Sequence, residues 1–165
     1  MRLKRLITHL LYSRLRLQRV FPPARLRRIE ALIRDAELGH QGEIRFAVEA
    51  ALDFSALWRQ QSARQRAIDV FSHLRVWDTE HNNGILVYLL MADRDVEIVA
   101  DRGIHRHVGD DVWASICRDM ETHFRKSDFE TGIEAGIRAI AAHLSRHYPA
   151  SEKQRNEIPD APIIL

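Results

Sequence analysis

Residues 82–104 constrain the fold of this chain most strongly, because they have the pattern of a complete β-hairpin. The segment opens with an Asn-Asn-Gly turn, and these residue types tolerate positive φ angles. An apolar run over residues 85–92 follows; it is too short to cross a membrane and suits a strand buried on both faces. Residues 93–95 then reverse the chain, and residues 96–100 alternate between apolar and polar. The segment therefore predicts the centre of a sheet.

Before the hairpin, the sequence alternates helical and strand patterns. A helix is expected from the Pro22-Pro23 pair until Gly39, and a strand over residues 43–50. A further helix of about twenty residues is expected from Ser55, ending near residues 76–78. This helix would be the crossover that places strand 43–50 parallel to the first hairpin strand.

After the hairpin, two more helices are predicted. A loop is expected after Gly103, followed by a helix that Asp110 caps. The last helix would begin with a capping box formed by Ser127 and Glu130, and Pro149 would end it.

These elements predict an α/β protein with a small mixed sheet of three to four strands, flanked by helices. An extra basic helix is expected in front of this domain. We therefore divide the chain into a basic helical arm (residues 1–21), an α/β domain (residues 22–149) and a loose C-terminal tail (residues 150–165). The single cysteine, Cys117, excludes an internal disulfide and is expected in the core, since it lies on an apolar helical stripe.

Charge is distributed unevenly along the chain. Residues 1–28 contain nine Lys or Arg residues and no acidic residue, whereas the remaining residues carry a net charge of −7. A basic arm on an acidic body is typical of an interaction segment and not of a nucleic-acid-binding fold. No nucleic-acid partner is therefore expected.

The arm also has an apolar face, which permits two interpretations of residues 1–20. The face is formed by Leu3, Leu6, Ile7, Leu10 and Leu11. It would dock on an anionic membrane surface or membrane-protein partner, or it would pack on its own domain. The apolar run is too short and interrupted for a secretory signal, and no transmembrane segment is evident. We expect a cytoplasmic location, peripheral at the inner membrane.

Common catalytic signatures are absent from the sequence: there is no GxGxxG, P-loop, GxSxG or HExxH motif. Two histidine pairs, His143 with His147 and His105 with His107, have spacings that could serve a metal ion. The first lacks the glutamate of a zincin, and the second is flanked by Arg102. Structural roles are therefore favoured for both pairs.

The polar residues near the hairpin offer the better metal hypothesis. Hard oxygen ligands suit Ca²⁺ or Mg²⁺ when several converge, and the candidate ligands are Asn82, Asn83, Asp101, Asp110 and Asp111. The alternative is local: turn formation for Asp93 and Asp95, and helix capping for Asp110.

The hairpin and the residues after it resemble the TPM-domain family, the thylakoid-lumen-phosphatase-like domain of bacteria and plastids. The resemblance covers residues 24–148 and is carried by Asn82-Asn83-Gly84, the apolar strand, Asp93-Arg94-Asp95-Val96-Glu97-Ile98, Gly103-Ile104, Phe124-Arg125, Phe129, Gly132 and Gly136. It implies an α/β domain with a small central sheet. Some relatives have been assigned phosphatase activity, some bind calcium, and many act as accessory factors in membranes.

The chain departs from the family pattern in three ways. It shows no export signal or anchor, a basic arm replaces the usual acidic entry segment, and Asp101-Arg102-Gly103 stands where relatives often have Gly-x-Gly. We therefore favour a non-catalytic interaction or accessory module at a membrane. The alternative is a divalent-metal-dependent phosphatase, with Asp101, Asp110 and Asp111 as ligands and Arg102 or Arg106 orienting phosphate. No nucleophile or general base can be named for it.

Overall fold

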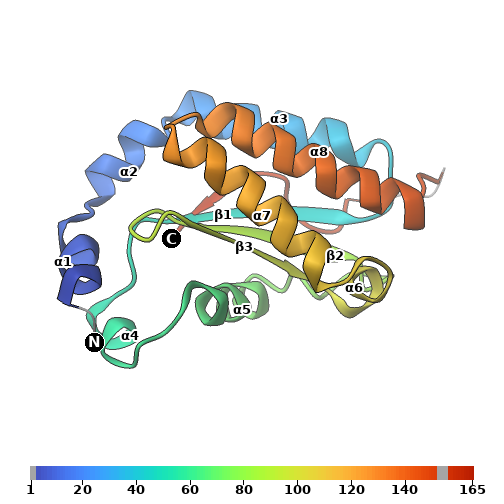
Figure 1. Cartoon of the computed structure of the whole chain (residues 1–165). Helices are drawn as coiled ribbons and strands as arrows, with labels where there is room; N and C mark the ends of the chain where they lie inside the picture. The colour runs from blue at the N-terminus through green and yellow to red at the C-terminus, as the bar shows by residue number, and fades with distance from the viewer. Residues whose placement is uncertain (1–2, 152–155) are drawn as a thin grey trace.

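The computed structural model describes residues 3–151 and 156–165, which form helices around one sheet (Figure 1). The sheet is open and mixed, with strand order β3-β2-β1-β4. The elements along the chain are α1 (Leu3–Leu11), α2 (Arg14–Val20), α3 (Pro23–Glu37), β1 (Glu43–Glu49), α4 (Phe54–Trp58), α5 (Ala63–His73), β2 (Gly84–Leu90), β3 (Asp95–Ala100), α6 (Arg102–Val108), α7 (Asp110–Arg125), α8 (Phe129–His147) and β4 (Ile163–Ile164).

The pairing of the three long strands confirms the predicted α/β topology. β1 and β2 are parallel, from Glu43 opposite Gly84 to Glu49 opposite Leu90. β2 and β3 form the antiparallel hairpin. All seven residues of β2 are buried, as expected for a central strand whose two faces are both covered.

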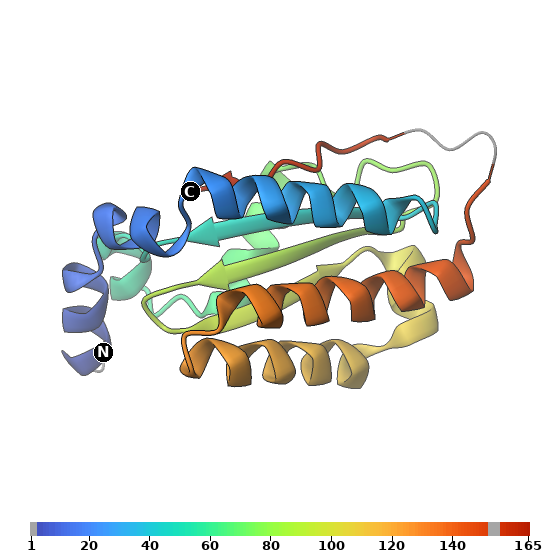
Figure 2. The same ribbon diagram turned by 90° about the horizontal axis from the view of Figure 1, so that it is seen from above.

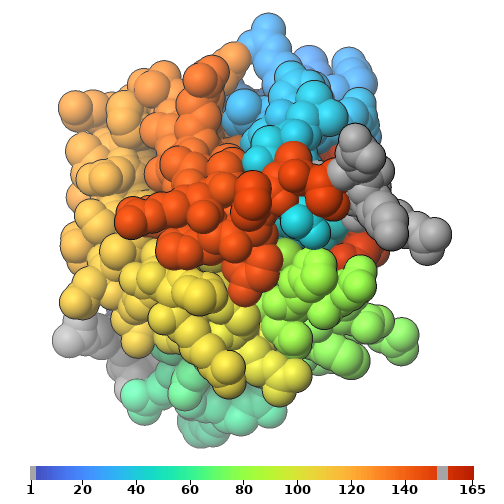
Figure 3. Space-filling view, turned by 90° about the vertical axis from the view of Figure 1, so that its right-hand side faces the viewer, coloured from blue at the N-terminus to red at the C-terminus, as the bar shows by residue number. Residues whose placement is uncertain are grey.

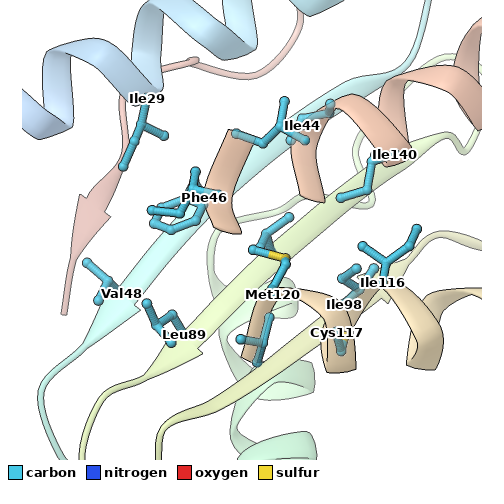
Figure 4. Packing of buried hydrophobic residues seen from close by; sticks show 14 of the residues in the cluster. Ile29, Ile44, Phe46, Val48, Leu89, Ile98, Ile116, Cys117, Met120 and Ile140 are labelled. Carbon is cyan, nitrogen blue, oxygen red and sulfur yellow. The ribbon is translucent and has the colours of Figure 1, made fainter. Parts of the chain in front are cut away.

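Helices cover both faces of the sheet (Figures 1 and 2). α3, α7 and α8 lie on one face, over a core that includes Phe46, Met120 and Ile140 (Figure 4). α4 and α5 lie on the other face, where a second cluster includes Tyr88. Cys117 is buried in the first cluster, as predicted, and burial raises the pKa of its thiol to about 12.

The crossover between β1 and β2 is two helices, so the prediction of one helix of about twenty residues is wrong. Gln60 adopts a left-handed φ of 56°, which ends the first helix. Ser62 and Gln65 then form a capping box that starts α5. Ile68, which a single helix from Ser55 was expected to turn inward, is 46% exposed in α5.

The segment after Gly103, expected to be a loop, is instead the helix α6, which Asp101 caps. α7 does begin at Asp110, but its N-cap is Gly109, with a φ of 83° and no side-chain hydrogen bond. The predicted capping role of Asp110 is therefore wrong, because Asp110 is already the first helical residue.

The cap of α8 also differs from the prediction. Ser127 has a φ of 62°, which excludes the extended conformation that an N-cap adopts. The N-cap is Asp128, whose carboxylate accepts a hydrogen bond from the Thr131 amide.

The C-terminal residues 156–165 pack on the domain, so the expectation of a loose tail is wrong for them. β4 pairs in parallel with β1. The Glu43 carboxylate accepts hydrogen bonds from the amides of Glu157 and Ile158, each at 3.1 Å. The tail thereby covers the outer edge of β1. Within residues 3–151 and 156–165, no helix has the length and apolar character needed to cross a bilayer.

Candidate functional site

The hairpin ends and the start of α6 meet at one end of the molecule, where residues 76–84, α6 and the end of α8 share a surface (Figure 3). The Asp101 amide donates to the Gly84 carbonyl at 2.9 Å, and the Gly103 amide donates to the Asn82 carbonyl at 2.9 Å. A Cβ atom on Gly103 would lie 2.4 Å from that carbonyl oxygen. Only glycine therefore permits this close approach of the two segments.

Two of the predicted ligands at this end have a buried oxygen that accepts no hydrogen bond from the described residues: Oδ1 of Asn83 and Oδ2 of Asp101. Their other atoms have structural partners. Asn83 Nδ2 donates to the Gln41 carbonyl at 3.0 Å, and Asp101 Oδ1 accepts from the Arg102 amide at 2.7 Å. Buried oxygens of this kind fit the donor set of a hard divalent cation.

The other predicted ligands have different surroundings. Asn82 Oδ1 accepts a hydrogen bond from Arg102 Nε at 3.1 Å. The Asp110 side chain is 83% exposed, and its carboxylate lies 3.9 Å from His105 Nε2. In the described part of the chain, no three His, Cys, Asp or Glu side chains form a group that could hold a metal ion. Asp101, Asp110 and Asp111 therefore do not form such a group, and a cation site here stays a prediction.

Aromatic packing involves the histidines of both candidate pairs. His107 stacks on His147 with ring centroids 4.8 Å apart, and His143 contacts Trp113 edge-on at 5.9 Å. Burial, together with the nearby charge of His107, lowers the pKa of His147. These contacts agree with the structural roles that the sequence favours.

The arm contributes a second candidate site, centred on Asp93 in the β2–β3 turn. Its carboxylate accepts hydrogen bonds from Arg5 Nε at 3.0 Å and Arg5 Nη2 at 2.8 Å. Burial acts to raise the pKa of Asp93, but the hydrogen bonds from Arg5 and His9 and the positive charge of Arg5 outweigh it and hold the pKa below its usual value. We name this arrangement of Arg5, His9 and Asp93 the arm clasp.

His9 joins the clasp to a second segment. Its side chain is fully buried; Nε2 lies 3.0 Å from Asp93 Oδ1, and Nδ1 accepts a hydrogen bond from the Leu52 amide at 3.0 Å. Because Nδ1 is an acceptor, the ring is neutral and its proton is on Nε2, where it is donated to Asp93. Arg5 also donates to the Gln61 carbonyl at 3.0 Å. The polar face of α1 is thus the face that contacts the domain.

The apolar face of α1 consequently points outward. Leu10 is 66% exposed and Leu11 is 74% exposed, and Leu3 and Ile7 are exposed as well. Leu6 is the exception, since it packs against the core under α5. The sequence predicted the two faces of this helix but assigned Asp93 only to a turn, so it missed the clasp.

Comparisons with known proteins agree with this fold. The family model of the TPM domain matches residues 16–143. The solution structure of the BA42 protein from the psychrophilic bacterium Bizionia argentinensis is similar, with a TM-score of 0.73 and 29% identity over 84% of this chain and 91% of that one. The N-terminal domain of a protein from P. gingivalis shares the fold, with a TM-score of 0.57 and 18% identity over 74% of this chain and 76% of that one. No curated protein matches. The chain belongs to the TPM-domain family.

Proposed function

We propose that this protein is a non-catalytic interaction module that docks on an anionic membrane surface, on its cytoplasmic side, through α1. The observation that carries the proposal is the orientation of α1. Its polar residues Arg5 and His9 are fixed on the domain, so its apolar side chains face solvent. An amphipathic helix that lies in a bilayer interface presents its apolar face in this way.

The charge around this face favours anionic lipid as the occupant. Residues 1–28 contain no acidic residue, and Lys4, Arg14 and Arg19 are exposed beside the apolar side chains of the arm. Each basic residue near an anionic leaflet contributes about 1 kcal/mol to binding. Burial of an exposed leucine contributes a further ~1.5–3 kcal/mol.

An aromatic pair at the same end of the molecule supports the proposal. Phe54 and Trp58 of α4 are exposed and stack with ring centroids 6.1 Å apart. α4 lies next to α1, because Leu52 and Gln61 on either side of it both hydrogen-bond to α1 (Figures 1 and 2). Tryptophan is enriched at membrane–water interfaces, where its ring is partly apolar and partly polar.

Vesicle co-sedimentation tests the proposal. We expect the protein to bind vesicles of phosphatidylcholine with phosphatidylglycerol and not pure phosphatidylcholine. Replacement of Leu10 and Leu11 by Gln should weaken binding at least about tenfold, from the lost apolar burial. Leu38→Gln is the matched control, since Leu38 is 75% exposed but lies after α3, outside the arm. Unchanged binding of the Leu10/Leu11 variant, or pull-down of a membrane protein without any vesicle binding, would refute lipid docking.

A divalent-metal-dependent phosphatase is the second candidate, favoured by the buried oxygens of Asn83 and Asp101. The test is a calorimetric titration of the protein with Ca²⁺ and with Mg²⁺. We expect Asp101→Asn to remove any binding heat and Asp119→Asn, an exposed aspartate on α7, to preserve it. The absence of heat at millimolar metal would exclude this function.

A further inference from the structure

A cavity lies between α2, the β2–β3 hairpin and the turn that joins α7 to α8. Its volume is about 90 Å³, which is room for a group of a few heavy atoms and not for a whole drug-sized ligand. Leu89, Met91 and Phe124 form a buried apolar floor. The cavity therefore combines a region that accepts an apolar group with a mouth that opens to solvent. We name it the hairpin pocket.

Polar side chains surround the mouth of the hairpin pocket. They come from three separate segments: Tyr12 and Arg16 from the arm, Arg94 from the hairpin turn, and Ser127 from the α7–α8 turn. Two arginines, a tyrosine and a serine thus line one cavity. Guanidinium groups bind phosphate oxygens in a fixed, bidentate geometry.

The two arginines form no ion pair with any residue of the described chain. Arg16 lies over the Tyr12 ring, 5.0 Å from its centroid. Burial raises the pKa of the Tyr12 hydroxyl, and the positive charges of Arg16 and Arg94 act against it. The nearest acidic residue along the chain, Asp93, is occupied by the arm clasp.

Asp95, on the other side of Arg94 in the sequence, has different neighbours. Burial and the negative charges of Glu97 and Glu121 raise its pKa to about 6. The positive charge that acts on it comes from Arg5. Arg94 also lines a neighbouring surface hollow with Asp95 and Glu121, but it forms no ion pair with either of these described residues.

The backbone at the mouth is left-handed at two of the lining residues. Arg94 has a φ of 54° and Ser127 a φ of 62°, both in the left-handed region. Glycine adopts this conformation without steric cost, whereas other residues are strained there by about 1 kcal/mol. Gln60, Arg75 and Asn82 have the same conformation outside the hairpin pocket, so it is the position of Arg94 and Ser127 at the mouth, and not their strain, that bears on binding.

We propose that the hairpin pocket binds the phosphate monoester headgroup of a lipid. Arg16, Arg94 and the hydroxyls of Tyr12 and Ser127 would hold the phosphate, and the adjoining carbon chain would leave through the open mouth. Two unpaired guanidinium groups match the charge of a phosphate monoester, which is between about −1.5 and −2 at neutral pH. The inference rests on the proposed membrane docking for its lipid source, but the pocket itself is testable without a membrane.

The first experiment compares vesicles that carry phosphatidic acid with vesicles that carry phosphatidylglycerol at the same surface charge. We expect the wild-type protein to bind the phosphatidic acid vesicles about tenfold more tightly, the difference that one or two charge-assisted hydrogen bonds produce. Arg94→Gly should remove this preference while it relieves the strained φ. The matched control is Arg75→Gly, because Arg75 is also exposed, with a φ of 53°, but lies outside the hairpin pocket.

The second experiment titrates the protein with a short-chain phosphatidic acid below its micelle concentration. Binding to wild type and Arg75→Gly, and loss in Arg94→Gly, would support the pocket even if the protein bound no vesicles. In that case only the docking proposal would fail. The Leu10/Leu11 variant should retain this soluble binding. Equal affinity for the two charge-matched vesicles, or no binding of the short-chain lipid, would overturn the inference.

Discussion

The arm clasp allows a sharp prediction: Asp93→Asn should release α1 without unfolding the domain. The carboxylate accepts two hydrogen bonds from Arg5 at 3.0 and 2.8 Å and lies 3.0 Å from His9 Nε2. An asparagine retains one oxygen and presents an amide N–H to the other donor. The substitution therefore removes the ion pair and leaves two donors facing each other.

The expected cost is about 2–4 kcal/mol. Hydrogen bonds to charged groups contribute about 1.5–3 kcal/mol each, and the value is reduced here because Arg5 is 27% exposed and Asp93 20% exposed. A nine-residue helix is only marginally stable alone in water. The loss should therefore appear as local opening of α1, with an open population at least about thirtyfold larger.

Hydrogen exchange followed by mass spectrometry measures this opening directly. Amides of residues 3–11 should exchange at least about thirtyfold faster in Asp93→Asn, while β2 should exchange as in wild type. Asp95→Asn is the matched control. Asp95 lies in the same turn and senses the Arg5 charge, but no hydrogen bond or ion pair joins it to the described residues 3–11, so exchange in α1 should stay unchanged. Unchanged protection of α1 in Asp93→Asn would show that the clasp does not hold the arm. An equal increase in β2 would show that the arm and the domain unfold together.

Three further predictions concern the stability of the domain. Gly84→Ala should destabilise it by about 3 kcal/mol or more in urea denaturation, because the new Cβ would lie 1.9 Å from the Val76 carbonyl oxygen, whereas Gly39→Ala should be tolerated. Burial raises the pKa of Glu37 to about 9, so between about pH 5 and pH 9 the folded protein holds a proton that the unfolded chain releases. The free energy of unfolding should therefore fall as the pH rises through this range, and Glu37→Gln should flatten the slope. Tyr88→Phe should cost about 1–3 kcal/mol, since the hydroxyl donates a buried hydrogen bond of 2.6 Å to a carboxylate of β1, and a thermal melt that matches wild type would contradict this.

The topology of the sheet was predictable because its signals are local. An eight-residue apolar run, an Asn-Asn-Gly turn and the alternation of β3 each reflect the environment of one strand. The break between α4 and α5 was also encoded, since Ser62 and Gln65 have the spacing of a capping box. The signal for the start of α5 was therefore present in the sequence, whereas the left-handed conformation of Gln60 could not be predicted from its residue type.

The arm and the tail could not be predicted in the same way, because non-local contacts position them. Arg5 and Asp93 are 88 residues apart in sequence, and Glu43 accepts from amides 114 and 115 residues later. The amphipathic pattern of α1 identifies two faces, and in most globular proteins the apolar face is buried. Here a buried histidine and a bidentate arginine reverse that orientation, which no periodicity in residues 3–11 encodes.

The β2–β3 turn links the two proposed membrane contacts, because consecutive residues in it have different roles. Asp93 holds α1 with its apolar face outward, and Arg94 lines the hairpin pocket next to Tyr12 and Arg16. Since Tyr12 directly follows α1, opening of the clasp should also displace this side of the pocket. Asp93→Asn is therefore expected to weaken binding of short-chain phosphatidic acid although Asp93 does not line the pocket, whereas Asp95→Asn should not. Weaker binding in Asp93→Asn alone would show that the turn and the arm form the pocket together. Equal binding in both variants would show that the pocket forms on the domain without the arm.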